Sequence, residues 1–154
     1  MVDRFEKFSS FIFEISRYWH KISGREMKKY GFKGTHALYL TTLRHFPEGI
    51  TATKLSDLCS KDKADVSRAI AFMESKGVLM RVDVNKNSYR ALIKLTDAGI
   101  SAADNISERA KIAVQFASRG ISDIKREIFY EVLGEISANL MKLSEDGLPP
   151  QQSS

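Results

Sequence analysis

The chain has 154 residues, of which 43% are hydrophobic and 28% are charged. That length and composition are typical of one globular domain with a substantial core, and they exclude a disordered or fibrous chain. The sequence holds 24 Lys or Arg against 19 Asp or Glu, a net charge of +5, and no apolar run approaches the roughly 18 residues of a membrane span. Because charged residues at positions 3–7 interrupt any signal-peptide core, we expect a cytoplasmic protein.

Residues 1–30 predict one long helix. Apolar residues recur there at alternating steps of three and four, which places them in one stripe along the helix. The stripe consists of Phe5, Phe8, Ile12, Ile15, Trp19 and Ile22. Three further aromatic residues, Phe11, Phe13 and Tyr18, lie off the stripe, so the helix is apolar over more than one face. A shorter helix over residues 35–46 and a turn at Pro47-Glu48-Gly49 are expected next.

A short support helix is predicted after the turn. Thr51 is its candidate N-cap. Leu55, Leu58 and Cys59 occupy apolar positions at helical spacing, and we expect them to face a core. The periodicity breaks at residues 60–61, where a turn is expected.

A second helix is predicted from Asp62, its N-cap, to Gly77, which is typical of the position just after a helix. Asp65 is an acid in its first turn, where the helix dipole favours negative charge. The predicted buried stripe is Val66, Ala69, Ile70 and Met73. The outward positions near its N-terminal end are Lys63, Ala64, Asp65, Ser67 and Arg68. A helix that reads the DNA major groove needs short or hydrogen-bonding side chains there.

Residues 78–84 and 89–95 predict two β-strands, because both segments are rich in β-branched and apolar residues. The polar residues between them predict a hairpin. A basic hairpin, here with Lys86 and Arg90, suits a wing that follows the phosphates or enters the minor groove. Taken singly, each piece is compatible with an ordinary capped helix or a solvated hairpin. In this order and spacing, the pieces predict a winged helix-turn-helix that binds double-stranded DNA.

These motifs resemble those of the multiple-antibiotic-resistance regulator (MarR) family. Residues 51–81 match that family's helix-turn-helix without a gap, with the sequence TATKLSDLCSKDKADVSRAIAFMESKGVLMR. The family's Leu-Thr-x-x-Gly is matched by Leu95-Thr96-Asp97-Ala98-Gly99. The resemblance covers nearly the whole chain in layout and residues 51–99 as motif. It implies a prokaryotic, homodimeric DNA-binding regulator of transcription.

The wing departs from the family pattern. The family commonly has an Asp and an Arg just before the second strand, where this chain has Asn87 and Tyr89, with Arg90 one residue later. Because a shift of one residue turns a side chain to the opposite face of a strand, Arg90 either reaches the minor groove through a bulge or pairs with an acid on the neighbouring strand. In the second case, Tyr89 or Lys86 would make the minor-groove contact in place of Arg90. Lys61 also adds positive charge where the family usually has a small or apolar residue.

The candidate DNA-contacting residues belong to the turn, the second helix and the wing. They are Lys61, Lys63, Ala64, Asp65, Ser67, Arg68, Lys86, Asn87, Ser88, Tyr89 and Arg90. Residues 61–94 hold eight Lys or Arg against four acids, a net +4, whereas residues 97–154 hold six against nine, a net −3. The positive potential therefore lies on the part predicted to read DNA.

The C-terminal part predicts a connecting helix over residues 97–119 and a last helix over residues 120–146, with Ser122 as a candidate N-cap. The last helix carries the stripe Ile121, Ile124, Ile128, Val132, Ile136, Leu140 and Leu143. A chain of this size could hardly bury both terminal stripes, so we expect a symmetric homodimer through residues 1–30 and 120–146, which is similar to how the family dimerises. The expected interface residues are Phe5, Phe8, Ile12, Ile15, Ile128, Val132, Ile136 and Leu140. Residues 33–99 would form the winged domain, and residues 147–154 a frayed tail.

Little in the sequence favours catalysis. The three histidines are widely spaced, Cys59 is the one cysteine, and no glycine-rich phosphate loop or nucleophile elbow occurs, so neither a metal site nor a cofactor is expected. Cys59 could be a redox sensor, but its apolar helix position favours core packing. The family often binds a small aromatic or anionic effector between the dimerisation helices and the winged domain. The resemblance implies such a pocket at Trp19, His20, Phe32, His36, Tyr39 and Arg44. Core packing explains Trp19, Phe32 and Tyr39 at least as well.

The sequence thus predicts a mainly α-helical winged helix-turn-helix protein with a small β-wing. Its expected function is ligand-responsive repression of transcription by a homodimer on a pseudo-palindromic operator. Two other functions stay open, namely a winged-helix protein-interaction module without DNA binding and an RNA-binding winged helix.

Overall fold

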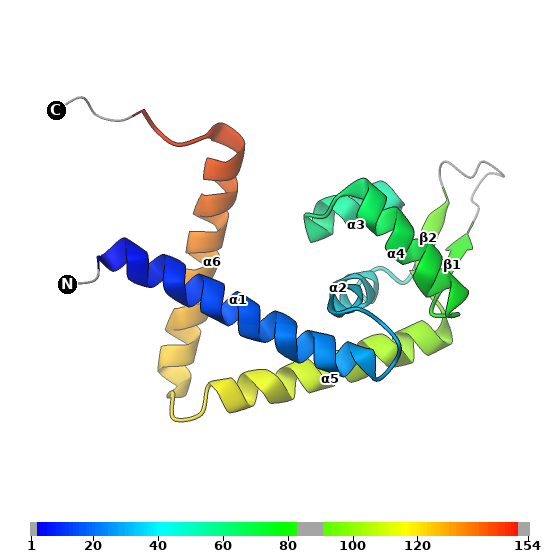
Figure 1. Cartoon of the computed structure of the whole chain (residues 1–154), viewed down its shortest axis with the longest axis horizontal. Helices are drawn as coiled ribbons and strands as arrows, with labels where there is room; N and C mark the ends of the chain where they lie inside the picture. Colours follow the sequence, from blue (N-terminus) through cyan, green and yellow to red (C-terminus); the bar gives the residue numbers. More distant parts are fainter. Residues whose placement is uncertain (1–2, 83–90, 151–154) are drawn as a thin grey trace. The chain divides into compact units, whose positions relative to one another are not determined.

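The computed structural model of the protein describes residues 3–82 and 91–150 (Figure 1). The elements in chain order are α1 (Arg4–Lys28), α2 (Gly34–Leu43), α3 (Ala52–Cys59), α4 (Lys63–Ser75), β1 (Leu79–Val82), β2 (Leu92–Leu95), α5 (Asp97–Ala117) and α6 (Asp123–Asp146). The predicted fold class, mainly α-helical with a small two-stranded antiparallel sheet, is confirmed. Among the described helices, none combines the length and the apolar character needed to cross a membrane.

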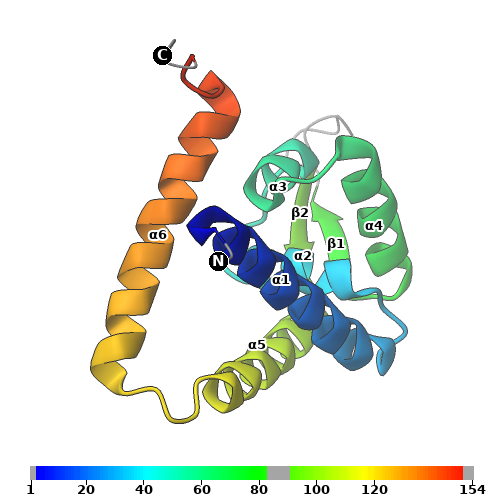
Figure 2. The ribbon, with the colours of Figure 1, turned by 60° about the vertical axis from the view of Figure 1, so that its left-hand side comes forward.

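The chain forms two compact units, Met1–Ala110 and Lys111–Ser154. In the first unit, α2 contacts α1, α3 and β2, while α4 contacts α3 and β1. Figure 2 shows α4 running beside the hairpin. The second unit holds the end of α5 and the whole of α6.

The core of the first unit contains buried side chains from α1 to α5 and from both strands, with Ala103 as the contribution of α5. Its largest fully buried side chains are Met27, Leu40, Leu43, Leu55, Val66, Ile70, Met73 and Ile93. Each such side chain contributes about 1.5–3 kcal/mol by leaving water. Because α3 and α4 have only 8 and 13 residues, this packing, rather than intrinsic helix propensity, stabilises them.

The segment between α2 and α3 pairs with the hairpin. The Ile50 N–H donates to the Ile93 carbonyl at 3.0 Å, and the Ile93 N–H donates back at 2.7 Å. Gly49, just before this bridge, has a φ of +89°, and an added Cβ would lie 3.0 Å from the Ile93 oxygen. A residue without a side chain is therefore needed at this point.

Some predicted bounds were wrong. The helix predicted over residues 35–46 is α2, and it ends at Leu43 because the Phe46 N–H donates to the Leu43 carbonyl in a tight turn before Pro47. The two strands occupy Leu79–Val82 and Leu92–Leu95, and positions 83–84 and 89–90 of the predicted strands lie outside the described residues. Val78 is not in a strand: its N–H donates to the Met73 carbonyl and closes the end of α4 around Gly77, whose φ is +74°.

Candidate nucleic-acid interface

Helix α4 carries the candidate recognition face. The Ala64 N–H donates to Asp62 Oδ1 at 2.9 Å, which confirms Asp62 as the N-cap. All four predicted stripe residues, Val66, Ala69, Ile70 and Met73, are buried. All five predicted outward residues, Lys63, Ala64, Asp65, Ser67 and Arg68, are exposed. The helix therefore presents small and hydrogen-bonding side chains from its N-terminal half.

An ion pair links two of these outward residues. The Arg68 guanidinium donates to the Asp65 carboxylate one turn earlier in α4, and both side chains are mostly exposed. An exposed pair of this type is weak, on the order of 0.3–0.5 kcal/mol. Arg68 can therefore leave Asp65 for a guanine edge or a phosphate at little cost.

Helix α3 and the following turn position α4. The Lys54 N–H donates to Thr51 Oγ1 at 3.2 Å, which confirms the predicted N-cap. Leu55 and Cys59, one turn apart, are buried as expected. The expectation for Leu58 was wrong, because its side chain is 46% exposed. Ser56 is buried instead of Leu58, and its hydroxyl donates to the carbonyl of Lys61 in the turn.

The turn ends α3 sharply before α4 begins. Ser60 has a left-handed backbone with a φ of 49°, a conformation unusual outside glycine, asparagine and aspartate. Lys61 follows and is exposed, next to the start of α4. The turn thus adds a cation beside the recognition face.

The base of the wing is described and its tip is not. β1 pairs with β2 in the register Leu79 with Leu95 through Val82 with Leu92. The predicted contacts at Lys86, Asn87, Ser88, Tyr89 and Arg90 lie outside the described residues, and so do the two alternatives for Arg90.

Arg81, on β1, donates to Glu74 of α4 at 3.0 Å. This contact links the base of the wing to the C-terminal end of α4. The sequence did not reveal it, because it depends on how α4 and β1 pack.

The Leu-Thr-x-x-Gly motif joins the wing to α5. Thr96 Oγ1 accepts the Gly99 N–H at 3.1 Å and donates to the Gly77 carbonyl at 2.6 Å. Gly99 is buried, and a Cβ built on it would lie 2.0 Å from the Val78 oxygen. The motif therefore lets the first turn of α5 lie directly against the end of α4, with no side chain between.

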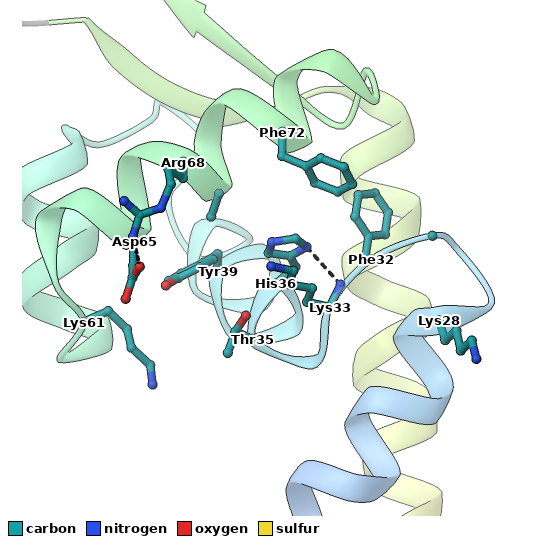
Figure 3. Close-up of a pocket in the computed structure, with 12 residues that line it drawn as sticks. Lys28, Phe32, Lys33, Thr35, His36, Tyr39, Lys61, Asp65, Arg68 and Phe72 are labelled. Atoms are coloured by element: carbon teal, nitrogen blue, oxygen red, sulfur yellow. Dashed lines mark hydrogen bonds and ion pairs between the residues drawn. The ribbon is translucent and has the colours of Figure 1, made fainter.

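A hollow of about 570 Å³ lies between the N-terminal part of α2 and one flank of α4 (Figure 3). We call it the α2–α4 hollow. It is lined by Lys28, Gly31, Phe32, Lys33, Thr35, His36, Tyr39, Lys61, Asp65, Arg68, Ala69 and Phe72. Four of these residues are cationic and one is an acid, so the hollow favours an anion.

Three aromatic rings meet at one end of this hollow. His36 stacks on Phe72 with ring centroids 5.2 Å apart, and Phe32 meets both rings edge-on, at 5.8 Å from His36 and 5.9 Å from Phe72. Phe72, like Lys28 and Lys33, was missed by sequence reasoning, because nothing local links α4 to the start of α2. Burial, followed by the charge of Lys33, lowers the pKa of His36 from its ordinary 6.5. Burial likewise raises the pKa of Tyr39.

The structure brings together only part of the predicted effector pocket. Phe32, His36 and Tyr39 line the α2–α4 hollow. Arg44 lines a separate hollow of about 370 Å³, and its Nε donates to Asp104 at 2.7 Å. Trp19 and His20 are exposed on α1 and line neither hollow.

The apolar stripes of the terminal helices are largely uncovered within the chain. Helix α6 has no buried residue, although Ser122 caps it as predicted by accepting the Lys125 N–H. On α1, Met27 alone is buried. Residues of the predicted interface that are exposed are Phe5, Phe8, Ile12, Ile15, Ile128, Val132 and Leu140, while Ile136 is half-buried. The described residues contain no group of three His, Cys, Asp or Glu able to hold a metal.

Solved structures match this chain over most of its length, although no family model and no curated protein matches its sequence. A MarR transcriptional regulator from Methanosarcina mazei Go1 has 22% identity and a TM-score of 0.82, covering 93% of this chain and 94% of that chain. A putative MarR family regulator from Listeria monocytogenes, complexed with 26mer DNA, has 21% identity and a TM-score of 0.79, covering 99% of this chain and 100% of that chain.

The S. aureus MepR–DNA complex has 16% identity and a TM-score of 0.76, with coverage of 86% of this chain and 97% of that chain. The chain therefore has the fold of MarR transcriptional regulators. The resemblance seen in the sequence is confirmed at the level of the fold.

Proposed function

We propose that the protein is a transcriptional regulator of the MarR family that binds double-stranded DNA in a sequence-specific manner. The observation that carries this proposal is the exposed N-terminal half of α4, whose outward side chains are short or hydrogen-bonding while the opposite stripe is fully buried. Two structures of similar fold are described as DNA complexes, which supports the same use here. The net positive charge of residues 61–94 fits phosphate contacts.

The direct test selects binding sites from a pool of random-sequence duplexes and measures affinity by mobility shift, with and without excess single-stranded RNA. Ser67→Ala or Arg68→Ala should weaken binding to the selected site more than binding to random duplex, by about 1–3 kcal/mol per lost base contact. Arg119→Ala, an exposed arginine after α5, is the matched control and should change neither. Failure to enrich any duplex would refute sequence-specific binding, and displacement by RNA would favour the RNA-binding alternative.

We further propose a homodimer formed through α1 and α6. The supporting observation is the set of large apolar side chains that both helices leave in water, since so large an apolar surface is typical of an interaction site. Ile128→Asp should yield monomer, while Ser137→Asp, on the same helix, should not. Light scattering on the full chain should report twice 17.4 kDa. A monomeric wild type at micromolar concentration would contradict the dimer.

The regulator is proposed to be a cytoplasmic repressor that responds to a small anionic or aromatic effector. The cationic and aromatic lining of the α2–α4 hollow supports this class of ligand. Salicylate is a suitable probe. It should lower the affinity of the wild type for its selected duplex, and Lys33→Ala with Phe32→Ala should reduce that effect. An unchanged affinity at millimolar salicylate would argue against an effector of this class.

A further inference from the structure

His36 makes a contact that joins the start of α2 to the recognition helix. It lies in the first turn of α2 and is 5% exposed. The Lys33 N–H donates to its Nδ1 at 3.1 Å, which caps the N-terminus of α2. On the other side, its ring stacks on Phe72 of α4 with an interplanar angle of 28° (Figure 3).

This hydrogen bond requires a neutral ring. Because Nδ1 accepts, the proton of neutral His36 must be on Nε2. A protonated imidazole carries a proton on both nitrogens and has no acceptor. Two N–H groups, those of Lys33 and His36 Nδ1, would then face each other at the present 3.1 Å.

We propose that protonation of His36 releases α4 from the N-terminus of α2 and thereby weakens DNA binding. Once Nδ1 is protonated, the ring must turn away from the Lys33 N–H. Turning the ring ends its stacking on Phe72, which is one turn beyond Arg68 on α4. Acid therefore acts on the helix that presents the DNA-contacting side chains. This inference rests on the proposed DNA-binding function.

The groups around His36 oppose a positive charge on it. The charged and titratable groups of the α2–α4 hollow are Lys28 and Lys33 beside the start of α2, Tyr39 on α2, Lys61 in the turn before α4, and Asp65 and Arg68 on α4. Burial is the larger cause of the lowered pKa of His36, and Lys33 adds to it.

The direction of the pH dependence follows from that lowered pKa. A released His36 regains its ordinary value of 6.5 and binds more protons than the packed one. The packed arrangement is therefore fully favoured above pH 6.5, and its advantage decreases as the pH falls below that value. A ligand shifts an equilibrium only through a difference in affinity between two states, and the proton has that difference here.

The test compares the full-length wild type with His36→Gln over pH 8 to 5. Glutamine at this helix position can still accept the N-cap N–H but does not titrate. Affinity for the selected duplex is measured at constant salt, and NMR follows the Lys33 amide and the Phe72 ring. His20→Gln and His45→Gln remove the two other histidines, both exposed, and serve as matched controls.

Between pH 8 and pH 5, we expect the duplex affinity of the wild type and of both control variants to fall on the order of fivefold more than the duplex affinity of His36→Gln. The Lys33 and Phe72 resonances should shift with the same midpoint, below pH 6.5. Identical pH profiles for the wild type and His36→Gln would overturn the proposal. If no duplex is bound at any pH, the proposed DNA-binding function is refuted independently of the pH effect. If the Phe72 resonances do not shift as His36 titrates, the release of α4 is refuted.

Discussion

Gly99→Ala should destabilise the protein strongly, although alanine is the better helix former. Gly99 lies in the first turn of α5, where an added Cβ would be 2.0 Å from the Val78 oxygen and 3.2 Å from Leu95 Cβ. Ordinary carbon–oxygen contacts are about 3.3 Å or longer, so the Val78 carbonyl would have to move by more than an ångström. That carbonyl also accepts the Thr96 N–H at 3.1 Å, which the movement would stretch or break.

The expected loss in the free energy of unfolding is about 2 kcal/mol. Forcing a methyl group into a packed site costs about 1–3 kcal/mol, and a weakened hydrogen bond adds about 0.5–1.5 kcal/mol. The higher helix propensity of alanine offsets about 0.5–1 kcal/mol. For a chain of this size, the net loss corresponds to a Tm lower by roughly 4–8 °C.

Urea unfolding followed by circular dichroism measures this loss, with Gly24→Ala as the matched control. Gly24 is also a helical glycine of the first unit, and an added Cβ there meets no atom within 4 Å. Gly24→Ala should therefore be neutral or stabilising, by up to about 1 kcal/mol. If Gly99→Ala proves as stable as Gly24→Ala, the proposed close approach between α5 and Val78 is wrong.

Two further substitutions test the cap of α4 and the link between α1 and α5. Asp62→Ala should lower stability by about 1 kcal/mol through loss of the N-cap, and an equal loss in Asp57→Ala, on the exposed face of α3, would contradict that cause. Glu26 accepts from Arg109 and from Lys29, and these two hydrogen bonds, in that order, lower its pKa below 4.5. The stabilising effect of ionised Glu26 is therefore present above pH 4.5 and is lost as the pH falls through the lowered pKa. The difference in Tm between the wild type and Glu26→Gln should vanish in acid. A difference in Tm that stays constant with pH would argue against the ion pairs.

Features that depend only on residues close together in the sequence could be predicted from it. Thr51, Asp62 and Ser122 each accept a backbone N–H two or three residues ahead, so the residue type and the pattern that follows it were sufficient. The buried stripe of α4 follows from helical periodicity in the same way. Leu58 shows the limit of that reasoning, because a helix as short as α3 buries too few positions for periodicity to tell which of two adjacent residues faces the core.

The parts of the site that depend on packing between distant segments could not be predicted. The stack of His36 on Phe72 joins residues far apart in the chain, and no local pattern marks it. Gly99 was recognised as part of a motif, but its physical reason, the Val78 carbonyl at the end of α4, exists only once the wing is folded. Trp19 and Arg44 were grouped with His36 by resemblance, whereas in the structure neither lines the hollow that His36 lines.

Ile50 also bears on the solubility of the protein. Strand edges with unpaired N–H and C=O groups recruit strands from other molecules, and a two-stranded hairpin has two such edges. At Ile93, both main-chain groups on the side away from β1 are taken by Ile50. One residue of the α2–α3 connection thus blocks intermolecular strand pairing at Ile93 of β2, and we expect a substitution that breaks this pairing to cause aggregation during expression.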